Sequence, residues 1–219
     1  MIEAVISDFG GVLTTPLLEA LVAVQDGFGV SLESYGTAVA AARERDGVNP
    51  LYALERGEIT EAEFLARIER ELEDQLGQSV SLHGFGAWLM DALAPNEELF
   101  AHYRGLRDRG LRLALLTNNV REWEPLWRAK LPIDEVFETV VDSGFVGMRK
   151  PEPGIYELML ERLGLPGEVC AFVDDLQINI DAAQAFGMHG VVFRDTGQAI
   201  AELDALLADG AAPRAGERR

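Results

Sequence analysis

The sequence of 219 residues has one cysteine, few basic residues and no long hydrophobic run. A single cysteine cannot pair within the chain, so a fold held together by internal disulfides is excluded. Only 19 lysines and arginines stand against 37 acidic residues, which gives a formal net charge of −18. Nucleic acids and anionic membranes bind basic surfaces, so neither is an expected partner of this chain.

Hydrophobic runs are also short, and none approaches the roughly 20 residues that cross a bilayer. No basic segment precedes the first apolar run, so a signal peptide is not expected. Hydrophobic residues nevertheless make up 48% of the chain and charged residues 26%, which is typical of a globular protein with a sizeable core. We therefore expect a folded cytoplasmic protein.

Several short apolar runs end in turn residues or polar residues and predict buried strands. They cover residues 3–7, 111–116, 136–141, 170–173 and 190–193. Helical patterns lie between them, including one that begins at the N-cap residue Asn96 and stops at Gly110, and two more over 154–163 and 178–186. This alternation predicts an α/β fold with a mostly parallel sheet covered on both faces.

Residues 15–95 interrupt the alternation because they contain no strand-like run. Thr60 to Glu63 is typical of a capping box, and it leads into apolar residues on one helical face: Phe64, Leu65, Ile68, Leu72 and Leu76. We expect a helical domain at 15–95, inserted into a core formed by 1–14 and 96–209. The segment 210–219 has no apolar face and predicts a frayed tail.

Polar residues occupy the carboxyl ends of the predicted strands, where doubly wound sheets bind their ligands. They are Asp8, Thr117, Asn118, Asp174 and Asp175, with Asn179 one helical turn later and Lys150 in the loop after the third strand. Three carboxylates repel one another, and a hard cation with oxygen ligands, such as Mg²⁺, relieves that repulsion. A carboxylate nucleophile, a metal, polar donors and a lysine are the parts needed for phosphoryl transfer to a carboxylate.

Four segments resemble, in order and spacing, the motifs of the haloacid dehalogenase superfamily of aspartate-nucleophile hydrolases. They are Asp8-Phe9-Gly10-Gly11-Val12, Leu116-Thr117-Asn118-Asn119, Lys150-Pro151-Glu152-Pro153, and Val173-Asp174-Asp175 with Asn179. The helical insert resembles the cap of this family. Its segment from Glu55 to Phe64 is similar to caps of the subgroup that contains the N-terminal phosphatase domain of soluble epoxide hydrolase and bacterial sugar-phosphate phosphatases.

The resemblance implies a Rossmann-like core with an α-helical cap and a Mg²⁺-dependent hydrolase of small phosphomonoesters, sugar phosphates among them. Asp8 would attack phosphorus and form an aspartyl-phosphate, with Lys150 and Thr117 as further catalytic residues. The implied metal site consists of Asp8, the backbone carbonyl of Gly10, Asp175, Asp174 and Asn179, and which of the two adjacent aspartates binds directly stays open. The implied substrate-binding residues are Thr117, Asn118, Lys150 and Gly11.

Gly10 departs from the family pattern, because most phosphatases of this family carry an aspartate there as general acid. Such an acid contributes about 10²–10⁴-fold to the rate. Three explanations stay open: a leaving group that needs no proton, an acid from the cap or from water, or an activity other than phosphate hydrolysis. In addition, a backbone with positive φ would itself require glycine at this position.

The alternative enzyme is a 2-haloacid dehalogenase, because halide leaves without a proton. Dehalogenases of the family do not keep the pair Asp174-Asp175 and need no Mg²⁺, so that pair favours a phosphatase. A catalytically weak binding or regulatory protein is the alternative from another class. The expected partner is a small phosphorylated molecule, and we expect a monomer or a homodimer.

Overall fold

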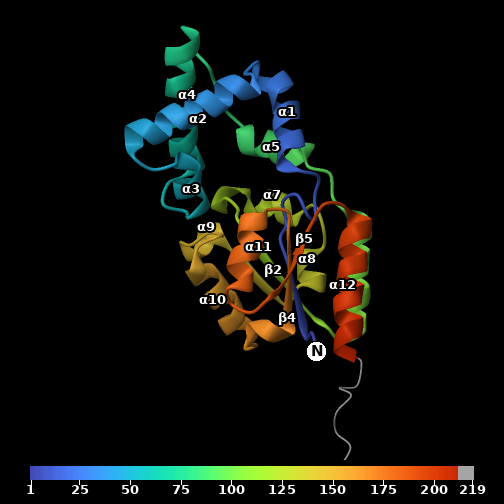
Figure 1. The fold of residues 1–219 in the computed structure, drawn as a ribbon. Helices are drawn as coiled ribbons and strands as arrows, with labels where there is room; N and C mark the ends of the chain where they lie inside the picture. Colours follow the sequence, from blue (N-terminus) through green and yellow to red (C-terminus); the bar gives the residue numbers. More distant parts are fainter. Residues whose placement is uncertain (212–219) are drawn as a thin grey trace, which may run out of the picture.

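The protein, seen in a computed structural model, is described over residues 1–211, without the side chains of residues 23, 24, 26 and 209–211. A single sheet of five parallel strands forms the centre, in the order β3-β2-β1-β4-β5 (Figure 1). The strands are β1 (Ala4–Ser7), β2 (Arg112–Thr117), β3 (Thr139–Asp142), β4 (Cys170–Asp174) and β5 (His189–Val192). The central position of β1 places the residue that follows it, Asp8, in the middle of the sheet edge.

Alternate residues of the strands enter two different hydrophobic clusters, one on each face of the sheet. Val5 packs on the face covered by α6 (Glu97–Asp108) and α12 (Thr196–Ala211), whereas Ile6 packs against α10 (Pro153–Leu163) and α11 (Gln177–Gln184). Strands buried on both faces read as continuous apolar runs, which explains why the sequence showed no alternation along them.

Shorter helical elements fill the connections of the core. They are η1 (Arg121–Trp123), α7 (Glu124–Arg128), α8 (Ile133–Val136), α9 (Ser143–Val146) and η2 (Gly167–Val169). The turn η1 and helices α7 and α9 follow the carboxyl ends of β2 and β3. They therefore lie on the side of the core where the functional residues are expected.

Five helices and no strand occupy the chain from Leu17 to Ala92, and they form a separate layer above the carboxyl ends of the strands (Figure 1). They are α1 (Leu17–Phe28), α2 (Leu32–Asp46), α3 (Pro50–Glu55), α4 (Glu61–Leu76) and α5 (Phe85–Ala92). The predicted α/β class with an inserted helical cap is therefore confirmed. The exact boundaries at 14/15 and 95/96 stay predictions.

The chain enters and leaves this layer at one place. Thr14 and Pro95 form an isolated antiparallel bridge, and the amide of Thr15 donates to the carbonyl of Ala94 at 2.9 Å. Asn96 begins α6 as predicted, because its Oδ1 accepts from the amide of Leu99 at 3.2 Å. The two crossings are therefore hydrogen-bonded to each other.

Two local expectations are wrong. The strand predicted for 136–141 begins only at Thr139, because Val136 ends α8 and the buried ring of Phe137 packs edge-on against Tyr103 instead of extending the ladder. Leu76 is 39% exposed, since it is the last residue of α4, whereas Phe64, Leu65, Ile68 and Leu72 are buried as expected.

Within the described residues, no helix is both long and apolar enough to cross a membrane. The tail predicted for 210–219 lies almost entirely outside the described residues, because the description ends with α12 at Ala211.

Candidate active site

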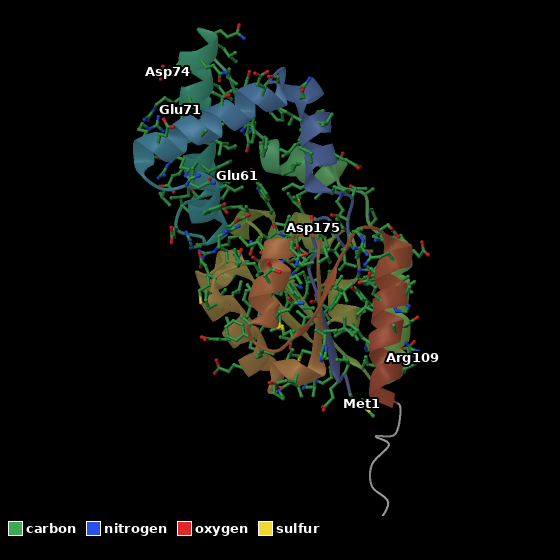
Figure 2. All side chains as sticks on the ribbon, viewed as in Figure 1. Met1, Glu61, Glu71, Asp74, Arg109 and Asp175 are labelled. Atoms are coloured by element: carbon green, nitrogen blue, oxygen red, sulfur yellow. The ribbon has the colours of Figure 1, made fainter. Side chains whose placement is uncertain are left out.

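The polar residues expected at the strand ends lie at the edge of the sheet that faces the helical layer. Asp8 follows β1, Thr117 ends β2, and Asp174 ends β4. Figure 2 shows Asp175 at this edge, below the helices of the cap, while Met1 lies at the opposite end of the core. The parallel arrangement of the strands is what brings these side chains to one place.

Lys150 joins the nucleophile candidate to the acid at the end of β4. Its Nζ lies 2.7 Å from Asp8 Oδ1 and 2.7 Å from Asp174 Oδ2. The lysine side chain is only 1% exposed, so this charge is separated from bulk solvent and is held between the two carboxylates. The backbone amide of Phe9 donates to the same Asp8 oxygen at 2.7 Å.

Asp174 uses both of its oxygens within the protein. Oδ2 contacts Lys150, while Oδ1 accepts from Asn179 Nδ2 and from the amide of Leu176, each at 2.9 Å. Tyr156 donates from its hydroxyl to the carbonyl of Asn179 at 3.0 Å, which fixes the first turn of α11. Asp175 is partly exposed, and it is the carboxylate of the adjacent pair that is available to a ligand.

Burial and mutual repulsion set the charges of this cluster. Burial raises the pKa of Asp8, and Asp174 and Asp175 raise it further against the opposing effect of Lys150. Burial alone would lower the pKa of Lys150, but Asp174 and Asp8 outweigh it and raise that pKa. The pKa of Asp175 is raised by burial and by its neighbour Asp174. Three carboxylates therefore share one buried ammonium, which leaves them short of positive charge.

The same three carboxylates, Asp8, Asp174 and Asp175, each place one oxygen within 4.8 Å of the others. Oxygen-only donors with excess negative charge suit a hard divalent cation. The residues present therefore fit a metal of the Mg²⁺ type.

The two glycines after Asp8 differ in what their backbone requires. Gly11 has φ +79°, and a Cβ there would lie 2.6 Å from Asp175 Oδ2, so a side chain would displace this carboxylate. Gly10 has no such φ, and nothing lies within 4 Å of where its Cβ would be. A backbone requirement therefore does not explain Gly10, and the space beside it is open.

The side chains of Thr117 and Asn118 have different surroundings at the site. Asn118 is turned onto the backbone of Lys150: its Nδ2 donates to the Lys150 carbonyl at 3.0 Å, and its Oδ1 accepts from the Lys150 amide at 2.8 Å. The side chain of Asn118 therefore positions Lys150. Thr117 is buried at the carboxyl end of β2, next to the residue that follows β1. The amide of Gly11, expected to bind substrate, donates to Thr14 Oγ1 at 3.2 Å.

Sequence reasoning did not assign roles to four charged residues around Lys150. Arg149 pairs with Glu55, and Glu152 pairs with Arg56. Each pair joins residues more than ninety positions apart, 94 and 96 respectively. The only sequence signal is that each segment carries an acidic and a basic residue within four positions, which does not specify the pairing.

Comparison with known proteins supports the family assignment. The family model for haloacid dehalogenase-like hydrolases matches residues 2–187. The chain is 31% identical over 211 residues to acyl-CoA dehydrogenase family member 10 of Mus musculus, which covers 94% of this chain and 19% of that protein. It is 25% identical over 169 residues to bifunctional epoxide hydrolase 2 of Rattus norvegicus, covering 71% of this chain and 30% of that protein. The chain thus spans less than a third of either relative.

A relative of similar length is phosphatase MT3486 of Mycobacterium tuberculosis, 31% identical over 168 residues, with 69% of this chain and 72% of that protein covered. Among solved structures, a family enzyme of Bacteroides thetaiotaomicron in complex with magnesium and inorganic phosphate has a TM-score of 0.64 at 22% identity, covering 89% of this chain and 95% of that one. Dehalogenases are also similar in fold. With its parallel sheet, helical cap and carboxylate cluster, the chain belongs to the haloacid dehalogenase-like hydrolases.

Proposed function

We propose that this hydrolase is a Mg²⁺-dependent phosphatase of small phosphomonoesters, with Asp8 as the nucleophile. The observation that carries the proposal is the buried Lys150, which bridges Asp8 and Asp174 at 2.7 Å each beside the partly exposed Asp175. The phosphatase relative and the phosphate complex of the structural neighbour support the same chemistry. Sugar phosphates and other small phosphorylated metabolites are the proposed substrates, and a monomer or homodimer in the cytoplasm is the proposed form.

Asp8 and Asp175, with the carbonyl of Gly10, would hold the cation, because both oxygens of Asp174 are already engaged. When bound, Mg²⁺ supplies positive charge that offsets the repulsion between the carboxylates and the phosphate. Asp174 and Asn179 would support the proposed metal site without contacting the cation directly. Asn179 Nδ2 donates to Asp174 Oδ1 at 2.9 Å.

The proposed reaction has two displacements at phosphorus. One carboxylate oxygen of Asp8 attacks while the other would contact the cation, the bond from phosphorus to the ester oxygen breaks, and this ester oxygen leaves with the electron pair and takes a proton from water. Water then attacks the aspartyl-phosphate, which releases inorganic phosphate and restores Asp8. Lys150 and the Phe9 amide hold Oδ1 and so fix the orientation of the Asp8 carboxylate.

Thr117 and Lys150 are the proposed partners of the transferring phosphoryl group. Thr117 offers a hydroxyl at the end of β2, and Lys150 offers positive charge beside the nucleophile. Asn118 acts on the substrate through the placement of Lys150, since its side chain is bonded to the Lys150 backbone. Gly11 contributes close packing against Asp175, which a larger residue would prevent.

Hydrolysis of an aryl phosphate with and without Mg²⁺, in the unmodified protein and Asp8→Asn, tests the proposal. We expect turnover that depends on Mg²⁺ and falls by roughly 10³-fold or more when the nucleophile is lost. Asp204→Asn is the matched control, because Asp204 lies on α12 at a distance from the carboxylate cluster and should retain activity. Equal activity of Asp8→Asn and the unmodified protein would contradict the assignment.

The same preparations separate the alternatives. Halide release from a 2-haloacid without added metal would select the dehalogenase. Binding of Mg²⁺ by calorimetry without turnover of any phosphate in a metabolite panel would select the binding or regulatory protein. Asp175→Asn should weaken Mg²⁺ binding in the calorimetric measurement whether or not turnover is observed.

A further inference from the structure

The segment from Arg149 to Glu152 is fixed from two sides, by the core and by the cap. From the core, Asn118 makes two hydrogen bonds to the Lys150 backbone, of 3.0 and 2.8 Å. From the cap, the residues at the end of α3 reach the two charged side chains that flank Lys150. Lys150 thus carries its buried ammonium on a short segment held between both layers.

Glu55, the last residue of α3, accepts from Arg149 Nε at 2.5 Å. The two side chains are 13% and 15% exposed, so solvent screens this pair little. The Arg149 guanidinium also stacks on the ring of Tyr52, one turn earlier in α3, at 3.9 Å from the ring centre. Arg149 is therefore held by the cap through both charge and stacking.

Arg56 forms the second pair, with its Nε 2.8 Å from Glu152 Oε1. The other oxygen of Glu152 accepts from the backbone amide of Arg149 at 3.1 Å. Glu152 therefore carries the contact with Arg56 directly to the backbone beside Lys150. The next cap residue, Gly57, approaches the core so closely that a Cβ there would clash with the carbonyl of Gly144.

We propose that Glu55 and Arg56 of the cap are positioning residues for Lys150, acting through Arg149 and Glu152. When α3 lies against the core, the two cap–core ion pairs, Glu55–Arg149 and Arg56–Glu152, fix the backbone from which Lys150 reaches Asp8. When α3 moves away, both pairs break together and Lys150 loses that support. This inference rests on the proposed function for its kinetic consequence, but its structural part does not.

The two members of the Glu55–Arg149 pair should differ in how much activity is lost when each is replaced. Glu55 is largely buried, and its ion-pair partner is Arg149. Without Arg149, the Glu55 carboxylate would be left buried without this partner, beside the segment that carries Lys150. Loss of Arg149 should therefore be worse than loss of Glu55, and removing Glu55 as well should restore part of the activity.

The experiment uses the full chain with Glu55→Gln and Arg56→Gln, singly and together. Glu71→Gln is the matched control, because Glu71 pairs with Arg45 within the cap and has a similar exposure of 13%. The first measurement is hydrogen exchange of the Arg149 and Lys150 amides in the metal-free protein, with melting temperature recorded to verify folding. We expect exchange to accelerate roughly fivefold to tenfold in the double variant, as two coupled pairs are lost, and to stay unchanged in the control.

The second measurement separates kcat from KM for an aryl phosphate. We expect kcat of the double variant to fall about tenfold with KM within about twofold, because a displaced Lys150 impairs the reacting geometry more than binding. Arg149→Gln should lose more activity than Glu55→Gln, and Arg149→Gln with Glu55→Gln should recover part of the loss. A purely structural role would lower the melting temperature of these variants and leave kcat of the folded protein unchanged.

Identical exchange in the double variant and in Glu71→Gln would overturn the proposal, as would a fall in kcat without faster exchange at Arg149 and Lys150. Additive losses for Arg149→Gln and Glu55→Gln would overturn it as well. Absence of phosphatase activity in the unmodified protein would overturn the proposed function only. Accelerated exchange would still support the positioning role, because that measurement needs neither metal nor substrate.

Discussion

The two adjacent glycines after Asp8 differ in whether the structure requires glycine. Gly11 combines a left-handed φ of +79° with close approach to Asp175, so both the backbone and the neighbouring carboxylate exclude a side chain. Gly10 has neither constraint. Position 10 therefore has room for an acidic side chain.

Replacement of Gly10 by Asp should raise the turnover of simple alkyl phosphates, by at most the 10²–10⁴-fold typical of a positioned acid. Aryl phosphates, whose leaving groups need less protonation, should gain little. The measurement is a series of leaving groups for the unmodified protein and Gly10→Asp, with melting temperature alongside.

Gly10→Ala and Gly11→Ala serve as paired controls for this prediction. Gly10→Ala should change neither the melting temperature nor metal binding. Gly11→Ala should lower the melting temperature and weaken metal binding, because the added Cβ would clash with Asp175 Oδ2. A flat dependence on leaving-group pKa in the unmodified protein, with chemistry rate-limiting, would show that another group already donates the proton.

Asp142, the N-cap of α9, gives a pH dependence that is independent of the metal site. Burial raises its pKa from 3.8 to about 6, against the hydrogen bond from the Gly144 amide, and its Oδ2 has no partner among the described residues. A raised pKa in the folded state means that this group stabilises the fold fully below pH 3.8. That contribution is lost as pH rises through about 6.

Asp142→Asn removes this titration. Relative to the unmodified protein, the variant's free energy of unfolding should therefore increase between pH 4 and 7, by at most about 3 kcal/mol at about 1.4 kcal/mol per pKa unit. Denaturant unfolding at several pH values measures it. A difference between the two proteins that is constant over this range would contradict the assignment.

At the scale of elements, α4 shows how a local signal fixes a helix start. Thr60 Oγ1 accepts from the Glu63 amide at 3.2 Å, and Glu63 Oε2 accepts from the Thr60 amide at 2.8 Å, which completes the predicted capping box. These bonds satisfy amides that the helix itself leaves without partners. The start of α4 also adjoins the loop that carries Arg56 and Gly57.

Thr60→Ala should therefore lower the free energy of unfolding by about 1 kcal/mol, the usual cost of losing an N-cap side chain. Thr37→Ala is the control, since Thr37 is exposed in the interior of α2, where alanine is the better helix former. Chemical denaturation of both variants measures the difference. Equal stability of Thr60→Ala and Thr37→Ala would show that the capping box contributes nothing measurable.

Elements and site residues were predictable from the sequence to different extents. Asp8, Asp174 and Lys150 could be placed together because parallel strands end at one edge, a rule that needs no side-chain geometry. The start of β3 was not predictable, since the apolar Phe137 serves packing against Tyr103 just as well as it would a strand. The ion pairs of Arg149 and Glu152 depend on how the cap lies on the core, which local patterns do not encode.

At the scale of the whole molecule, the cap and one face of the sheet share a single hydrophobic cluster. Its members extend from Leu72 in α4 through Leu89 in α5 and Leu13 at the crossing to Val5 in the sheet. The other cluster, around Ile6 and Met159, belongs to the core alone. Apolar packing that continues from one layer to the other couples their unfolding.

We therefore expect thermal unfolding in a single transition, with the cap and the core unfolding together. Calorimetry should give equal calorimetric and van't Hoff enthalpies, the test of two-state unfolding. Probes in each layer provide the check: Trp88 in α5 reports on the cap and Trp127 in α7 on the core. Separate transitions of these two fluorescence signals, in variants that keep one tryptophan, would contradict the expectation.

The paired crossings at Thr15 and Ala94 have a consequence for how such an enzyme diversifies. Because the chain leaves the sheet and returns at one hydrogen-bonded point, the five strands keep their neighbours whatever is inserted there. Exchange of the insert between related chains thus changes the helices that cover the carboxyl ends of the strands and leaves the order of the sheet unchanged. New specificities can arise by recombination at two junctions without a change in strand order, provided that the new insert also contacts Arg149 and Glu152.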